Sequence, residues 1–326
     1  MDSFIFAINA VLPLIIIVCL GYILRQIGFI SEDMPKALNK IIFRVLLPCM
    51  LFSNVYNMES IENIDLGYIA YAMIVVFVIF FAAIPIVMAV TKKGARRGVL
   101  LQSVFRSNFA LIGLSLVSSL CGDGGLGIAA LLSAFAIPIF NVLAVISLSI
   151  FSDAEGGVNI KKILLDIAKN PLIVSVISGI AVLLVRSLFI KWNIEWRLSD
   201  VDVIFKTLNS LSSIATPLAL ISLGAQFKLS AVKGMRREII FALIARLTIV
   251  PLLTLSVAYL FFDFEAAHFA SFIALYATPV AVSSVPMTQE MGGDAELAGQ
   301  IVVWTTAMSG ITIFLITFTM KLLGIF

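Results

Sequence analysis

The stretch Tyr276-Ala-Thr-Pro-Val-Ala-Val-Ser-Ser-Val-Pro286 lies inside an apolar run that extends from about residue 267 to residue 289. Pro279 and Pro286 each remove a backbone N–H donor and clash with the preceding turn, so a straight helix is costly here. Within a bilayer, such a break persists only where protein or a water-filled cavity covers the released backbone groups. The stretch therefore indicates an interrupted membrane helix, which is a candidate binding site. A simple proline kink stabilised by neighbouring helices is the alternative.

The composition of the chain is typical of a polytopic membrane protein. Of the 326 residues, 61% are hydrophobic and 13% are charged, and the mean hydropathy is +1.12. Several apolar runs exceed the ~18 residues that mark a membrane-spanning helix. The three cysteines and the single His268 have no paired spacing, which argues against a disulfide framework and a metal site, and we expect no cofactor.

Hydropathy predicts an all-α fold with ten transmembrane helices joined by short loops. The longest loop, 152–170, leaves no room for a soluble domain between the spans. The predicted spans are 4–24, 36–57, 67–91, 99–120, 126–151, 171–190, 204–226, 236–262, 267–289 and 297–323.

The lysines and arginines predict how the chain is oriented, because most of them fall in alternate loops. The positive-inside rule places these loops in the cytoplasm and both termini outside, in a multi-pass protein of the cytoplasmic (inner) membrane. General attraction to lipid headgroups explains the same clusters and is compatible with this topology. The clusters are Arg25, Lys36 and Lys40; Lys92, Lys93, Arg96 and Arg97; Lys161, Lys162 and Lys169; and Lys228, Lys233, Arg236 and Arg237.

Prolines recur in matching spans of the two halves of the chain. These coincidences favour a diverged duplication, with residues 1–151 as the first repeat, 152–170 as a cytoplasmic linker and 171–326 as the second repeat. Because five spans is an odd number, the second copy enters the membrane from the opposite side and the repeat is inverted. Chance is the alternative explanation of the pairs, which are Pro13 with Pro171, Pro48 with Pro217, and Pro85 with Pro251.

In such a repeat, the partner of the interrupted span nine is span four. That span reads Phe105-Arg-Ser-Asn-Phe-Ala-Leu-Ile-Gly-Leu-Ser115 and contains no proline. A buried asparagine in a membrane helix needs polar partners and often marks a pathway, and glycine permits close backbone approach. Ordinary helix packing is the alternative role for Asn108 and Gly113.

Three motifs stand in span order along the chain: Leu47-Pro48 with Phe52-Ser53-Asn54, Arg106-Ser107-Asn108 with Gly113, and Ala277-Thr278-Pro279 followed by Gln289-Glu290 and Asp294. Together they resemble the auxin efflux carrier family, in particular its bacterial malate permease-like members, which are distant relatives of the plant PIN-type carriers. The resemblance covers essentially the whole chain, and the span-nine motif is its most specific part.

The resemblance implies a fold similar to that of the bile-acid-type sodium symporters, with two inverted five-helix repeats. Spans one, two, six and seven would form a scaffold, which can also make a homodimer. Spans three to five and eight to ten would form a transport domain, with broken spans four and nine crossing each other. A small organic anion would bind at the crossing and move by elevator-type alternating access.

The chain departs from the plant members at three places. Ser115 stands where they have a span-four proline, and Ser284 corresponds to their crossover proline, with Pro286 displaced by two residues. We therefore expect a softer break in span four and a shifted break in span nine. Residues 67–91 contain no charged side chain, so a mechanism that depends on charges in span three does not transfer.

Broken helices predict how an anion would be held. The N-terminal ends of the second half-helices carry unpaired N–H groups and the positive end of the dipole, which favour an anion. Hydroxyl and amide side chains nearby can donate to carboxylate oxygens. The predicted substrate-binding residues are Asn108, Gly113, Ser115, Thr278, Pro279, Ser283 and Ser284 at the crossing, with Ser53 and Asn54 on span two and Asn141 on span five.

Three arginines, Arg44, Arg106 and Arg246, lie seven or more residues inside predicted spans. A charge there costs at least a few kcal/mol and should face protein or water. Arg44 is expected to snorkel to the cytoplasmic surface. Arg106 either snorkels as well or collects anions at the inner mouth. Arg246 lies about ten residues into span eight, and an interhelical partner is favoured there over substrate.

These features together predict a secondary transporter for a small organic anion, such as malate or an auxin-like indole acid, that works as a uniporter or is linked to protons. The crossing holds no carboxylate, and Glu290 follows Ser284 by roughly 9 Å along a helix, which disfavours the sodium-coupled alternative. The chain has no Gly-x-Ser-x-Gly, His-Glu-x-x-His or Walker motif and no intramembrane aspartate pair. We therefore expect neither an enzyme nor a pump, and we expect no nucleic-acid partner.

Overall fold

The computed structural model describes residues 2–57, 66–151, 160–192, 194 and 196–326, and every regular element that these residues form is a helix. Among them, seven helices are long and apolar enough to cross a membrane: Met34–Tyr56, Gly67–Val90, Gly124–Ile150, Pro171–Lys191, Asp202–Gln226, Arg236–Phe261 and Ala295–Leu322. Three shorter apolar helices, Val11–Gln26, Phe109–Gly122 and Ala266–Tyr276, lie within predicted spans one, four and nine. The structure is therefore that of a multi-pass membrane protein.

The first half of the described chain contains the helices α1 to α6. Their bounds are α1 Asp2–Gln26, α2 Met34–Ile41, the π-helical turn η1 Ile42–Leu46, α3 Leu47–Tyr56, α4 Leu66–Val90, α5 Gly94–Phe105, the π-helical turn η2 Phe109–Gly113, and α6 Leu114–Ile150. Gly122 has φ 63° inside α6, so two helices meet there at an angle. A left-handed φ of this kind is readily adopted only by glycine. The kink at Gly122 therefore separates predicted span four from predicted span five.

The second half contains the helices α7 to α14. Their bounds are α7 Ile160–Lys169, α8 Pro171–Lys191, the 3₁₀ turn η3 Leu198–Asp200, α9 Asp202–Gln226, the 3₁₀ turn η4 Leu229–Gly234, α10 Arg236–Ile244, the π-helical turn η5 Ala245–Ile249, α11 Val250–Phe261, α12 Ala266–Tyr276, α13 Ser284–Glu290, and α14 Ala295–Leu322. The predicted linker 152–170 is thus partly helical, since α7 occupies most of its second half, and 152–159 lie outside the described residues.

Prolines at helix starts follow from local backbone chemistry. Pro171 begins α8 directly after Asn170, whose side chain accepts a hydrogen bond from the Leu172 N–H at 3.0 Å and so caps the helix. Pro48 and Pro251 each follow a π-helical turn, η1 and η5 respectively. Such a turn shifts the hydrogen-bond register and accommodates the missing proline N–H.

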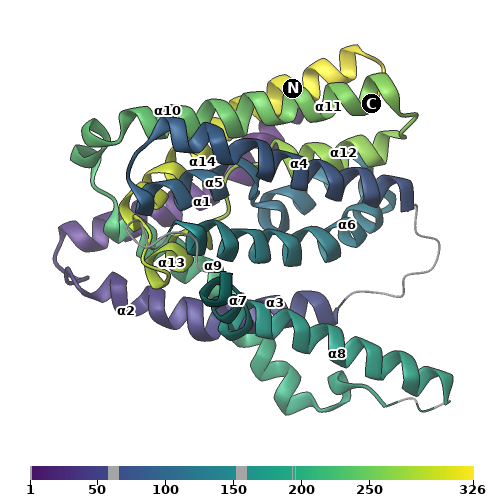
Figure 1. Cartoon of the computed structure of the whole chain (residues 1–326). Coiled ribbons are helices and arrows are strands. Elements are labelled where there is room, and N and C mark those ends of the chain that lie inside the picture. Colours follow the sequence, from purple (N-terminus) through teal and green to yellow (C-terminus); the bar gives the residue numbers. More distant parts are fainter. Residues whose placement is uncertain (1, 58–65, 152–159, 193, 195) are drawn as a thin grey trace.

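The helices form two groups that pack against each other (Figure 1). One group contains α3, α8 and α9, and the other contains α4, α5, α6, α10, α12 and α14, while α1 packs against both α9 and α14. Where α1 crosses α9, Gly21 and Gly224 allow the two backbones to meet, because a Cβ atom on Gly224 would overlap the Val18 carbonyl. A Cβ atom on Gly21 would likewise overlap the Ile221 carbonyl, so this crossing needs glycine on both helices.

Candidate functional site

Two helix breaks face each other in the interior of the protein. The first follows the end of α5 at Phe105, where Arg106 has extended backbone angles, and the second separates α12 from α13 between Tyr276 and Ser284. The two segments run antiparallel through a single bridge between Ser107 and Val280. The Asn108 N–H donates to the Pro279 carbonyl at 2.8 Å. Each break therefore supplies hydrogen-bond partners that the other lacks.

The structure places the span-nine break within the predicted stretch and the span-four break earlier than expected. Pro279 lies in the second break, whereas Pro286 lies in the first turn of α13, where no N–H donor is needed. In span four the helix stops at Phe105, before Gly113 and Ser115. The expected soft break around Gly113 and Ser115 is replaced by an extended segment upstream of both residues, because strand-like pairing with the other break stabilises it.

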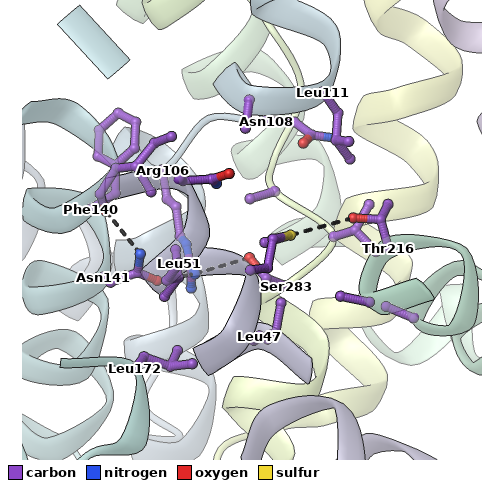
Figure 2. Close-up of a pocket in the computed structure, with 18 of the residues that line it drawn as sticks. Leu47, Leu51, Arg106, Asn108, Leu111, Phe140, Asn141, Leu172, Thr216 and Ser283 are labelled. Carbon is purple, nitrogen blue, oxygen red and sulfur yellow. Dashed lines mark hydrogen bonds between the residues drawn. The ribbon is translucent and has the colours of Figure 1, made fainter. Parts of the chain in front are cut away.

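A cavity of about 70 Å³ lies between the breaks and the helices α3, α6, α8 and α9. Figure 2 shows Arg106, Asn141 and Leu51 close together on one side and Thr216 on the other, with Ser283 between them. The remaining lining residues are Leu47, Met50, Asn54, Ser107, Asn108, Ala110, Leu111, Ile137, Phe140, Leu172, Ala215, Ala219, Ala281 and Val282.

Arg106 is the charged residue of this cavity, and its side chain is buried with only 3% exposure. Its guanidinium donates to Asn141 Oδ1 at 2.8 Å, to Ser283 Oγ at 3.0 Å and to Gln102 Oε1 at 3.2 Å. It also contacts the sulfur of Met287 at 2.9 Å. All these partners are neutral, and within the described ranges no carboxylate forms an ion pair with Arg106. A buried cation without a counter-charge is costly, so this position favours an anion.

The burial of Arg106 disagrees with snorkelling, whereas the collection of anions by this residue stays a prediction. Counting along a continuous helix places this residue near the cytoplasmic end of span four, where it would snorkel or guard the inner mouth. The helix instead ends at Phe105, and Arg106 begins the extended segment, so its side chain turns across the cavity towards α6 and α13.

Two further donors at the cavity have no partner in the structure. The Asn108 Nδ2 amide and the Ser107 hydroxyl are both buried, and neither makes a hydrogen bond. An unsatisfied buried polar group costs about 1–3 kcal/mol, so such groups are rare unless a ligand or water completes them. Three consecutive residues, Arg106 to Asn108, therefore place a positive charge and two unused polar groups at one cavity.

The structure brings only part of the predicted binding set to this cavity. Asn54, Asn108, Asn141 and Ser283 line it together with Arg106. The cavity is also lined by Ser107, Met50 and Thr216, which are not among the predicted substrate-binding residues. Ser107 carried a usable signal, because it stands between the two predicted residues Arg106 and Asn108.

The other predicted residues lie outside the cavity lining. Gly113 packs against α12, since a Cβ atom there would lie 3.1 Å from the Cβ of Ala274. Ser115 is exposed and donates to its own helix, and the Thr278 hydroxyl donates to the Ala274 carbonyl at 2.7 Å. The remaining buried residues outside the lining are Ser53, Pro279, Ser284 and Arg246. Arg246 instead donates to backbone carbonyls of both broken segments.

On the side of the cavity that holds the basic loops, polar contacts join α13 to α2 and η1, and α2 to α9. Asn39 of α2 donates to Gln289 Oε1 at 2.8 Å and accepts from the Ser222 hydroxyl of α9 at 2.9 Å. Arg44 pairs with Glu290 of α13 at 3.1 Å, while its side chain stays 61% exposed. These contacts hold the half-helix α13 against α2, η1 and α9.

A second polar cluster links α5, α10 and the start of α14. Arg96 pairs with Glu238 at 2.8 Å and with Asp294 at 2.9 Å, and all three side chains are largely buried. Asp294 also caps α14 by accepting from the Leu297 N–H at 2.9 Å. Within the part of the chain that the structure describes, no group of three His, Cys, Asp or Glu side chains is arranged to hold a metal ion.

Comparison with known proteins yields matches along almost the whole chain. The sequence profile of a family described as "Membrane transport protein" matches residues 6–317. An uncharacterized transporter of Methanothermobacter thermautotrophicus is 22% identical over 317 residues, which cover 92% of this chain and 94% of that protein. An uncharacterized transporter of Methanocaldococcus jannaschii is 27% identical over 231 residues, which cover 69% of this chain and 70% of that protein.

Proposed function

The chain belongs to the membrane transport protein family, that of the auxin efflux carriers, and from this premise we propose that it is a secondary transporter for a small organic anion. The evidence that the substrate is an anion comes from the cavity at the crossing of the two broken segments. There, the buried Arg106 has neutral partners, and the Ser107 hydroxyl and the Asn108 amide make no hydrogen bond. A carboxylate would neutralise the charge and accept hydrogen bonds from these donors.

The lining of the cavity supports a carboxylate attached to a partly apolar body. Leu47, Leu51 and Phe140 provide apolar walls, and Asn54 and Thr216 provide neutral polar groups. One guanidinium balances one negative charge, so a monocarboxylate such as an auxin-like indole acid matches the site better than doubly charged malate. Both belong in the test, because a second carboxylate can remain hydrated.

Elevator-type alternating access is the proposed mechanism. The scaffold would consist of spans one, two, six and seven, and the transport domain of spans three to five and eight to ten, in two inverted repeats of five spans each. In support, the cavity lies between α3, α8 and α9 on one side and the broken segments with α6 on the other. The cavity of about 70 Å³ must widen to admit substrate, so the contacts of α13 with Asn39 and Arg44 must open during the cycle.

The remaining parts of the proposal concern topology, assembly and coupling. Both termini lie outside the cytoplasmic membrane, in agreement with the distribution of lysines and arginines. A homodimer would form through the scaffold. Transport is uniport or proton-linked, with sodium coupling as the second candidate, because the crossing contains no carboxylate that would complete a sodium site.

Uptake by proteoliposomes tests this function. We expect labelled indole-3-acetate or malate to accumulate in sodium-free buffer and Asn108→Ala to lower the uptake strongly. Ser115→Ala serves as the matched control and should transport normally, since Ser115 is exposed and away from the cavity. If the protein transported neutral or cationic solutes but no carboxylate, the proposal of an anionic substrate would be refuted. Uptake that requires sodium would favour sodium-coupled symport over uniport.

A further inference from the structure

Arg246 is the largest fully buried side chain among the described residues, with 0% exposure. It belongs to the π-helical turn η5, which interrupts the helix between α10 and α11. Its Nε donates to the Thr278 carbonyl at 2.9 Å and its Nη2 to the Leu275 carbonyl at 2.8 Å. Its Nη1 donates to the Val104 and Phe105 carbonyls at 3.2 Å each. One guanidinium thus binds four backbone oxygens and no side chain.

The four oxygens come from the places where the two helices stop. Val104 and Phe105 end α5, Leu275 lies in the last turn of α12, and Thr278 follows that helix. The last carbonyls of a helix have no partner within it, and the C-terminal end of the helix dipole is negative. Two such ends therefore converge on one buried point, and their combined potential attracts a cation.

The chemistry at this point is that of a monovalent-cation site. Unwound carbonyls and the C-terminal ends of half-helices are the groups by which broken membrane helices coordinate Na⁺. In the described part of the chain no carboxylate pairs with Arg246, so carbonyl dipoles alone balance its charge. A guanidinium stays protonated throughout the physiological pH range, and being covalently attached it can be neither released nor exchanged.

We propose that Arg246 is a built-in counter-cation for the crossing, held where a free coupling cation would otherwise bind. The site is therefore permanently filled, and the protein needs no sodium or potassium ion to hold its two broken segments together. In its consequence for coupling, this inference rests on the proposed transport function. The cation site itself is a property of the fold and can be tested without any substrate.

The first test measures the thermal stability of purified protein in sodium, potassium and choline chloride at equal ionic strength. Wild-type protein should unfold at the same temperature in all three salts. The Arg246→Ala variant should unfold at a lower temperature than the wild type. Guanidinium chloride at tens of millimolar should raise the unfolding temperature of this variant by about 2–4 °C, as a ligand well above its Kd does. Wild-type protein is the control and should gain nothing from guanidinium. No rescue of Arg246→Ala would overturn the proposal.

A second pair of variants covers the case in which Arg246→Ala does not fold. Arg246→Lys keeps the positive charge, whereas Arg246→Gln keeps a hydrogen-bonding side chain of similar length without the charge. The proposal requires Arg246→Lys to unfold well above Arg246→Gln, and equal unfolding temperatures would reduce Arg246 to a packing residue. Sodium-dependent stability of the wild-type protein would also overturn it. Absence of carboxylate uptake would refute the proposed function but leave this cation test unchanged.

Discussion

Replacing Arg106 by glutamine should weaken anion binding and leave the empty protein at least as stable. The guanidinium is buried with neutral partners at 2.8–3.2 Å, so a bound carboxylate would be its counter-charge. At an effective dielectric constant of 20, two unit charges about 4 Å apart attract by ~4 kcal/mol. Each 1.4 kcal/mol corresponds to a factor of ten, so the affinity should fall by about 10²–10³-fold.

The effect on stability should have the opposite sign. Without substrate, Arg106 carries a desolvation cost that no carboxylate in the described chain offsets, and glutamine removes this cost. A glutamine amide has two N–H donors for the three oxygens that Arg106 contacts, so at most part of this hydrogen bonding is lost. The Arg106→Gln variant should therefore unfold at the wild-type temperature or above it, as expected where a functional site reduces stability.

Titration of purified protein with indole-3-acetate, followed by thermal shift or tryptophan fluorescence, measures both quantities. Lys206→Gln is the charge-matched control, because Lys206 is an exposed residue of α9 that pairs only with Asp202 on the same helix. Its affinity should equal that of the wild type. An Arg106→Gln affinity within threefold of the wild type, or a large drop in its unfolding temperature, would refute the assignment of this charge to substrate.

Three other perturbations follow from the packing and the polar contacts. Gly224→Ala should destabilise the protein by about 2–3 kcal/mol in denaturant unfolding, since the new Cβ overlaps a carbonyl of α1, whereas Gly310→Ala, with open space around it, should not. Arg96→Ala should cost about 3 kcal/mol in the same assay, because two largely buried carboxylates lose their partner. Cysteines at Asn39 and Gln289, joined by a short thiol cross-linker in a background without native cysteines, should stop transport.

Each of these results has an outcome that would count against its premise. Normal stability of Gly224→Ala would mean that α1 and α9 can separate freely. Lys206→Ala is the exposed-pair control for Arg96→Ala and should cost less than about 0.5 kcal/mol, so equal losses would show that burial does not matter. Transport by the cross-linked protein would exclude movement of α13 relative to α2, and a cleavable linker should restore activity after reduction.

Hydropathy and local backbone chemistry accounted for the helical membrane fold and for the break in span nine. Pro279 lacks an N–H and makes a continuous helix costly, so the stretch itself favours a break there. Proline alone does not enforce it, because Pro13, Pro85 and Pro217 lie inside continuous helices. Span four has no proline, and its break follows from pairing with a segment about 170 residues away, through Asn108 and Pro279. A contact of that kind leaves no local pattern in the sequence.

The position of Arg106 shows the same limit. Its burial depends on where α5 ends, and that end depends on the facing break. If α5 continued as a helix past Phe105, the Arg106 side chain would leave the helix in a different direction from the one that now takes it across the cavity. Similarly, Gly113 and Ser115 looked equivalent to Asn108 as site residues, but only Asn108 lies in the extended segment that faces the cavity.

By itself, the sequence determined that this chain crosses a membrane repeatedly, and it predicted an interruption of one span between Thr278 and Pro286 with polar residues nearby. These properties follow from apolar run length, proline geometry and residue type, all of which act locally. The tertiary structure decided which polar groups meet. Arg106 lies at the cavity among neutral partners and, among the described residues, has no negative counter-charge there, and Arg246 donates hydrogen bonds to the carbonyl groups at the ends of α5 and α12. The physical reason is that both arginines contact groups from segments far apart in the sequence, such as Ser283 for Arg106 and Val104 for Arg246, and only folding brings those groups together.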